Sequence, residues 1–336
     1  MRIHTASIAL SLSVVLGAAS ASADPSSTST EQAYDKGAIE GTRNVAFGGA
    51  DVALGSSTSA VYDNPANLAA SRVYHFEGII GLSPEANRQT YGGGIADSST
   101  NQLAARPAGA DAANGLAGGI AGTWSTMDPD GINRQWTDLR VGLAYPVLPN
   151  LFVGLTGRYL QVNQVTGVGP FGADLLSSGT PDQGLASIFT FNAGVTYRPI
   201  KALSLAILGQ NLTYPNHPIA PTTLTAGIGL DLHVFSLEFD EMTDFTTYET
   251  PTERLMVGTE VFLFDRLALR LGYRFDAGDR VHSVSGGLGW IDKHFSVEAS
   301  VRQDAIADHP NTFVVFGFRY FYDYNAAGQD PAMTAD

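Results

Sequence analysis

The feature that most restricts the fold is a two-residue alternation of apolar with small or polar side chains. In the clearest example, Leu267, Leu269, Leu271, Tyr273 and Phe275 alternate with Ala268, Arg270, Gly272 and Arg274. The same pattern recurs in residues 139–145, 151–159 and 295–302. Side chains of a β-strand point alternately to its two faces, whereas an amphipathic helix places apolar residues three and four positions apart. The chain is therefore predicted to be all-β.

The composition of the two faces indicates which one meets lipid. The polar faces consist mainly of Gly, Ala, Ser and Thr with single Arg or Glu residues, and charged residues make up only 15% of the chain. Several segments also end in aromatic residues, as the girdles of membrane barrels do; these are Trp124, Tyr145, Tyr197, Tyr214, Trp290, Tyr320 and Phe321. We predict a closed antiparallel transmembrane β-barrel with its apolar face toward lipid. A large soluble β-sandwich is the alternative.

About fourteen segments show this alternation, and an even number closes an antiparallel barrel with both termini on one side. They are residues 73–82, 88–96, 116–126, 134–146, 151–164, 187–198, 202–213, 221–232, 234–242, 252–263, 266–276, 281–291, 294–303 and 311–322. From residue 146 onward short and long connections alternate, as periplasmic turns and outer loops do. Both termini are therefore expected in the periplasm. The stretch 97–115 is long yet falls on the periplasmic side, so either this loop is unusual or one early strand is miscounted.

The N-terminal residues predict export. Residues 1–23 combine a basic start, an apolar stretch and Ala21-Ser22-Ala23, which is the pattern of a cleaved signal peptide. Residues 24–40 form a polar leader, and residues 323–336 form a polar tail that we expect in the periplasm. No later apolar run approaches the ~20 residues of a membrane-spanning helix. Together with the strand pattern, export predicts a location in the bacterial outer membrane, in contact with its lipid.

The charged residues on the predicted inner face are candidate functional residues. They are Glu77, Arg140, Arg158, Arg198, Glu238, Glu260, Arg270, Arg274, Glu298, Arg302 and Arg319, together with Asp231 and Asp240. Arginines that face acids across a lumen can select anions or close a pore by ion pairing. The simpler interpretation is the paired polar filling that a barrel interior requires.

Nothing in the sequence predicts catalysis, a metal site or a cofactor. The histidines left after signal removal do not have a ligand spacing such as H-E-x-x-H. Asp128, Asp130 and Asn133 resemble part of a calcium loop but are also good turn residues. A serine enzyme would need His282 to pair with Ser283 or Ser285, and no G-x-S-x-G motif accompanies them. The net charge of −14 argues against a nucleic-acid partner.

The order of several motifs resembles the FadL/PorV superfamily of outer-membrane barrels. The N-terminal part of the pattern is G-T-R-N-V-A-F-G-G-A-D-V-A-L-G at 41–55 and A-V-Y-D-N-P-A-N-L-A at 60–69. Later segments are closer to the PorV type; they are L-A-I-L-G-Q-N-L at 205–212, P-T-T-L-T-A-G-I-G-L at 221–230, E-V-F-L-F-D-R-L-A-L-R-L-G-Y-R at 260–274 and T-F-V-V-F-G-F-R-Y-F at 312–321. The resemblance implies a fourteen-strand barrel, residues 73–322, whose N-terminal segment folds inward as a hatch.

The hatch would comprise residues 41–72. Its small residues, including Gly48 and Gly49, suit a segment that is threaded through a confined lumen. Asn64-Pro65-Ala66 predicts a turn, because the residue before a proline avoids the helical region. A static plug and a moving gate remain alternatives.

The resemblance implies two functions for a non-enzymatic barrel. PorV-type members act in protein secretion, and FadL-type members take up hydrophobic compounds. We expect an accessory component that docks envelope or secreted proteins. The alternative is passive transport of small hydrophobic molecules, gated by the hatch. A lipid-modifying enzyme is a further alternative.

Overall fold

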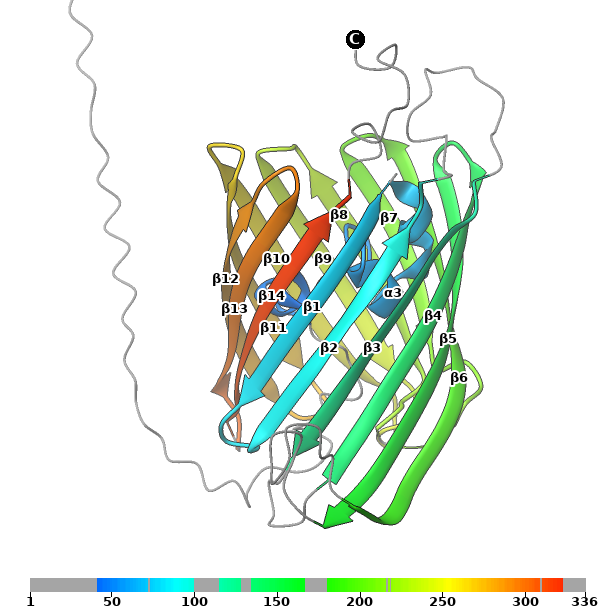
Figure 1. Ribbon diagram of the computed structural model, residues 1–336, viewed down its shortest axis with the longest axis vertical. Coiled ribbons are helices and arrows are strands. Elements are labelled where there is room, and N and C mark those ends of the chain that lie inside the picture. Colours follow the sequence, from blue (N-terminus) through cyan, green and yellow to red (C-terminus); the bar gives the residue numbers. More distant parts are fainter. Residues whose placement is uncertain are drawn as a thin grey trace, which may run out of the picture.

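The computed structural model shows a closed antiparallel barrel (Figure 1). It describes residues 41–71, 73–99, 115–127, 134–166, 180–215, 217, 219–308 and 310–322. The predicted signal peptide, leader and C-terminal tail lie outside the described residues, as do most of the turn at 127–133 and His309. Each strand pairs with its neighbours in sequence, and the last strand pairs with the first. The predicted fold class is thereby confirmed.

Fourteen strands form the wall, as the alternation predicts. Their bounds are β1 Tyr74–Ser83, β2 Arg88–Asp97, β3 Ala117–Met127, β4 Arg134–Leu148, β5 Leu151–Thr166, β6 Thr180–Ile200, β7 Leu203–Gln210, β8 Thr223–Asp231, β9 Phe235–Asp244, β10 Thr252–Leu263, β11 Leu267–Asp276, β12 Val281–Ile291, β13 Phe295–Ile306 and β14 Thr312–Phe321. Within the described residues, no helix is long and apolar enough to cross a membrane.

One strand differs clearly from its prediction, since β6 begins at Thr180 and not near residue 187. Residues 180–186 contain Pro and Gly and lack alternation, so the sequence reads as a loop. Two register shifts, at Val162/Asn163 and Gln164/Val165, nevertheless let this stretch continue its pairing with β5. Backbone pairing overrides side-chain pattern here because irregular strands can pair through bulges.

The barrel has two ends that differ in their connections. We call the end at which β1 begins and β14 finishes the turn end; it carries the connections 149–150, 201–202, 232–234, 264–266 and 292–294. The opposite end is the loop end. The strand count shows that no early strand was miscounted, so 98–116 is a long connection at the turn end. Residues 100–114 of that connection lie outside the described part of the chain.

The two faces of the wall have the predicted inverted polarity. On β4, Leu139, Val141 and Leu143 are about half exposed on the outer face, whereas Arg140 between them is 1% exposed. A wall surrounded by hydrocarbon keeps apolar side chains outside and polar ones inside. The alternation therefore fixes which side chains enter the lumen.

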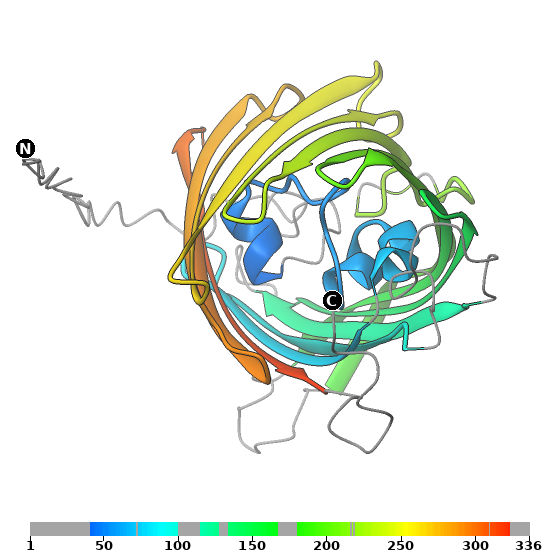
Figure 2. The same ribbon diagram turned by 90° about the horizontal axis from the view of Figure 1, so that it is seen from above.

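The N-terminal segment lies inside the ring of strands (Figures 1 and 2). It contains α2 Thr42–Ala46, α3 Ser59–Tyr62 and the 3-10 helix η3 Pro65–Ala70. Helix α2 packs against β11–β14, and η3 packs against β3–β6. The predicted hatch inside the lumen is thus present, and we use the name hatch for residues 41–71.

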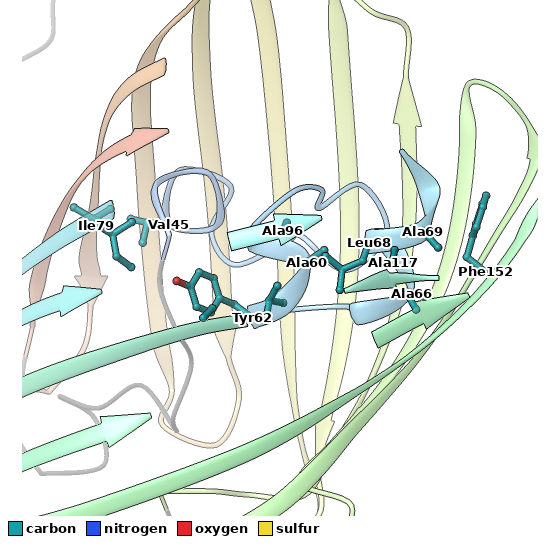
Figure 3. Close-up of a cluster of buried hydrophobic side chains, with 14 of the residues drawn as sticks. Val45, Ala60, Tyr62, Ala66, Leu68, Ala69, Ile79, Ala96, Ala117 and Phe152 are labelled. Carbon is teal, nitrogen blue, oxygen red and sulfur yellow. The ribbon is translucent and has the colours of Figure 1, made fainter. Parts of the chain in front are cut away.

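Apolar contacts fix part of the hatch to the wall (Figure 3). Tyr62 and Leu68 of the hatch share a buried cluster with Ala117, Phe152 and Phe313 of the wall. Fully burying side chains of this size contributes about 1.5–3 kcal/mol each. The α3–η3 half of the hatch therefore has a large apolar contact with the wall.

Two glycines of the inner wall face allow hatch backbone to lie directly on a strand. A Cβ at Gly154 of β5 would collide with backbone atoms of Pro65 and Ala66. A Cβ at Gly272 of β11 would collide with backbone atoms of Phe47 and Gly48. Glycine in a strand often marks such a close approach of another backbone.

We predict that Gly154→Val displaces η3 and destabilises the protein by about 1–3 kcal/mol, the usual cost of overpacking. Urea unfolding followed by tryptophan fluorescence measures the change. Gly78→Val is the matched control, because a Cβ at Gly78 of β1 meets no atom within 4 Å. Equal stability of the two variants would show that the hatch does not rest on Gly154.

Candidate functional site

The Asn64-Pro65-Ala66 turn is one of the places where hydrogen bonds join the hatch to the wall. Asn64 has an extended backbone (φ −97°, ψ 105°), as the following proline requires, and its side chain accepts from the amide of Ala66. Its Nδ2 donates to the carbonyl of Val52 and to Oγ1 of Thr196, both at 2.9 Å. The Thr196 hydroxyl in turn donates to Asn67. One asparagine therefore links two parts of the hatch and strand β6.

Gly48 and Gly49 reverse the chain after α2. Their φ angles are +67° and +96°, in the region that favours glycine. Gly48 also lies against the backbone of Tyr273, where a side chain has no room. This reversal directs residues 51–54 toward strand β9.

Two carboxylates of β9 hold residues 51–54. Oδ2 of Asp240 accepts from the amides of Asp51 and Val52, both at 3.0 Å. Oε1 of Glu238 accepts from the amides of Ala53 at 2.5 Å and Leu54 at 3.1 Å. Both carboxylates are fully buried.

The structure brings most of the predicted lumen charges into ion-paired groups. Arg140 and Arg158 share Asp138, with the shortest Arg158 bond at 2.6 Å. Other pairs are Arg270 with Glu260 and Glu298, Arg319 with Glu77, and Arg254 with Asp276. Removing one member would strand its buried partner, which is strongly destabilising. This arrangement agrees with a paired polar filling of the interior.

The remaining predicted charges lie at different places. Arg198 is half buried at the turn end and donates to the carbonyl of Ala70 at 3.3 Å. Arg302 is buried with its guanidinium 5.8 Å from the centre of the Phe313 ring. Arg274 borders an internal cavity, and the exposed Asp231 borders another.

Sequence reasoning missed several residues of the candidate site. Asp138 lies two residues before Arg140 and therefore on the same face of the strand. The alternation alone could have predicted that Asp138 faces the lumen. Arg43, Asp51 and Asp63 are hatch residues. The hatch sequence has no regular repeat of apolar residues from which the direction of these side chains could be predicted. Asp51 forms an ion pair with Arg43, which also lies 3.8 Å from Glu238.

Two cavities lie on opposite sides of the hatch. The loop-end cavity has a volume of about 70 Å³. Its lining includes Val52, Asp63, Leu208, Met242 and Met256, together with Arg140, Arg158, Arg254 and Arg274. The turn-end cavity has a volume of about 310 Å³ and is bordered by Arg43, Leu54, Asp231, Glu260 and Asp265, among others. The hatch therefore separates two spaces of one lumen.

The residues considered for enzyme chemistry do not meet. Ser283 faces the lumen and donates to Asp304, and Ser285 donates to the carbonyl of Ala46 in the hatch. His282 is on the opposite face of β12 and contacts the Tyr273 hydroxyl and the Phe275 ring. Adjacent residues of a strand face opposite sides, which rules out this Ser–His pair. Among the described residues, no group of three or more His, Asp or Glu side chains is placed to hold a metal ion.

Comparison with known proteins shows which fold this is. The sequence matches no protein-family model and no curated protein. The structure is similar to the toluene transporter TbuX of Ralstonia pickettii, with a TM-score of 0.59, 12% identity, and coverage of 85% of this chain and 99% of TbuX. For the monoaromatic hydrocarbon channel CymD, the TM-score is 0.57 with 14% identity, and 84% and 97% of the chains are covered. For a FadL homologue of Pseudomonas aeruginosa, the TM-score is 0.53 with 13% identity, and the match covers 85% of this chain and 99% of the homologue.

The chain therefore has the fold of FadL-type channels. The likeness is one of fold, and the closer relation to PorV remains a prediction.

Asp63 is expected to make hatch stability depend on pH. Burial raises the pKa of its carboxyl from 3.8 to about 8, with Arg140 opposing the rise and Glu238 adding to it. Within that interval the folded hatch binds a proton that the unfolded chain has released, so stability falls as pH rises through it.

We predict that the urea midpoint of the parent protein falls between pH 4 and pH 8 more steeply than that of Asp63→Asn, because the amide of the variant does not ionise. Asp308→Asn is the control, because Asp308 is exposed. Identical pH profiles for the parent and Asp63→Asn would contradict this assignment.

Proposed function

We propose that this protein is a non-enzymatic outer-membrane channel for small hydrophobic molecules, with the hatch as its gate. The observation that carries the proposal is the hatch folded across the lumen of a fourteen-strand barrel, with a cavity on each side of it. A segment that only filled the barrel would need no space on both faces. Such spaces are what a solute would occupy before and after passing the hatch.

The lining of the loop-end cavity supports a solute with an apolar body. Leu208, Met242 and Met256 line one side next to Val52 of the hatch. Methionine side chains adapt to irregular apolar shapes. The rest of the lining is polar, and its arginines Arg140, Arg158 and Arg254 are paired with Asp138 or Asp276.

We propose that the turn end faces the periplasm. Short turns on the periplasmic side and longer loops outside are usual for bacterial barrels. The connections at the loop end include 211–222 and 245–251, whereas all connections after β4 at the turn end have two or three residues. A solute would then enter by the loop-end cavity and leave by the turn-end cavity.

Uptake in an outer membrane tests this function. The chain, produced in a host without its own FadL-type channel, should raise uptake of radiolabelled toluene or oleate several-fold over the host alone. No increase with either probe, together with cross-linked envelope proteins, would refute transport and favour the docking role.

A reversible lock provides the matched control. A Cβ at Gly227 of β8 would lie 3.4 Å from the Cβ of Ala53, close to the separation in disulfides. It would also collide with the carboxylate of Asp240, so the single variant Gly227→Cys is a second control whose uptake should not respond to oxidant. In the double variant Ala53→Cys, Gly227→Cys, uptake should stop under oxidant and return with reductant. The single variant Ala53→Cys should not respond to oxidant.

A further inference from the structure

One part of the hatch lies between the two cavities. Val52 borders the loop-end cavity, and Leu54 borders the turn-end cavity. The same three strands line both spaces: Thr225, Met242 and Met256 on one side, and Asp231, Ser236 and Glu260 on the other. We call residues Asp51–Leu54 the gate loop. It crosses the lumen in front of β8, β9 and β10 and separates the cavities.

The gate loop is held differently from the rest of the hatch. Helices α3 and η3 belong to the large apolar cluster with the wall, which includes Tyr62 and Leu68. The gate loop has a much smaller apolar contact, in which Val52 and Ala53 meet Ala206 and Leu208. Its position therefore depends mainly on polar bonds, which can be exchanged for water when a solute or water enters.

Glu238 and Asp240 provide the polar bonds to the gate-loop amides. They accept from four consecutive amides, those of Asp51, Val52, Ala53 and Leu54. Hydrogen bonds to a charged partner are stronger than neutral ones, particularly where water is excluded. The carbonyls of Val52 and Ala53 are bonded separately, to Asn64, Asn67 and Ser204.

Acidic side chains outnumber cations around Glu238 and Asp240, so these two residues can release the gate loop. Asp51, Glu238 and Asp240 are buried in this region and Asp63 is half-buried, whereas Arg43 is the hatch cation beside Asp51 and Glu238. Oδ1 of Asp240 and Oε2 of Glu238 accept no hydrogen bond. Carboxyl groups that are crowded together in a buried site do not all stay ionised, and a neutral carboxyl accepts weaker hydrogen bonds from the amides than a carboxylate does.

We propose that Glu238 and Asp240 form a latch that closes an axial passage by holding the gate loop, and that their release joins the two cavities along β8, β9 and β10. The proposal deepens the transport function and rests on it. Solute would pass beside the gate loop while α3 and η3 stay in place. The latch residues position the loop, and they need not touch the solute.

Cysteine accessibility tests the latch, since the chain contains no native cysteine. Val52→Cys places a thiol on the gate loop at a position that is 5% exposed. The rate of its reaction with a membrane-impermeant maleimide is measured on the purified barrel, with exposed Ser56→Cys as the reference for the reagent. Adding Glu238→Ala or Asp240→Ala to Val52→Cys should raise the rate at this thiol about tenfold or more, because each removes two charge-assisted hydrogen bonds.

Two further sets of variants keep the test decisive. Glu238→Gln and Asp240→Asn preserve side-chain shape and should give intermediate rates, which also covers the case in which an alanine variant does not fold. Glu241→Ala removes a carboxylate of the same strand from its exposed outer face and should leave the rate unchanged. Unchanged reactivity of the gate-loop thiol in all four latch variants would overturn the proposal. Faster reaction without any uptake of toluene or oleate would keep the latch and refute the transport function.

Discussion

The whole architecture depends on the hydrogen-bond closure between β1 and β14. A bilayer supplies no water to satisfy backbone groups, so a sheet can cross it only as a ring without edges. The eight paired residues between His75–Leu82 and Val314–Phe321 complete that ring. Once the ring is closed, the alternation along every strand decides which side chains face lipid and which enter a confined, polar lumen.

The lumen in turn explains the unusual hatch. Polar side chains enter the barrel whether or not a partner exists, and each buried charge requires one. Some find it within the wall, as Arg140 and Arg158 do with Asp138. Others find it in the hatch backbone, as Glu238 and Asp240 do with four amides. The hatch backbone and the lumen side chains thus satisfy each other's hydrogen-bonding groups. Polar bonds and close backbone contact replace bulky side chains, so a segment of small residues is enough to hold the hatch.

The strands of the wall could be predicted because the direction of each side chain depends only on its position in a local two-residue repeat. The two-residue period predicts the strand count and places Arg140, Arg270 and Glu298 on the inner face. The hatch was predictable only as a resemblance, because residues 41–71 have no period that aims a side chain. The roles of Asp51, Asp63 and Arg43 follow from contacts with one another and with wall strands far along the chain. The early start of β6 was missed for a related reason, since backbone pairing with β5 maintains the strand where the side-chain pattern ends.

The central claim is that the hatch, held by wall side chains, closes an otherwise continuous lumen. Single-channel conductance in planar bilayers measures this most directly. The intact protein should conduct ions weakly or not at all, and a variant without residues 42–70 should form a steady, clearly larger pore. Equal conductance of the two proteins, with both barrels folded, would contradict the account.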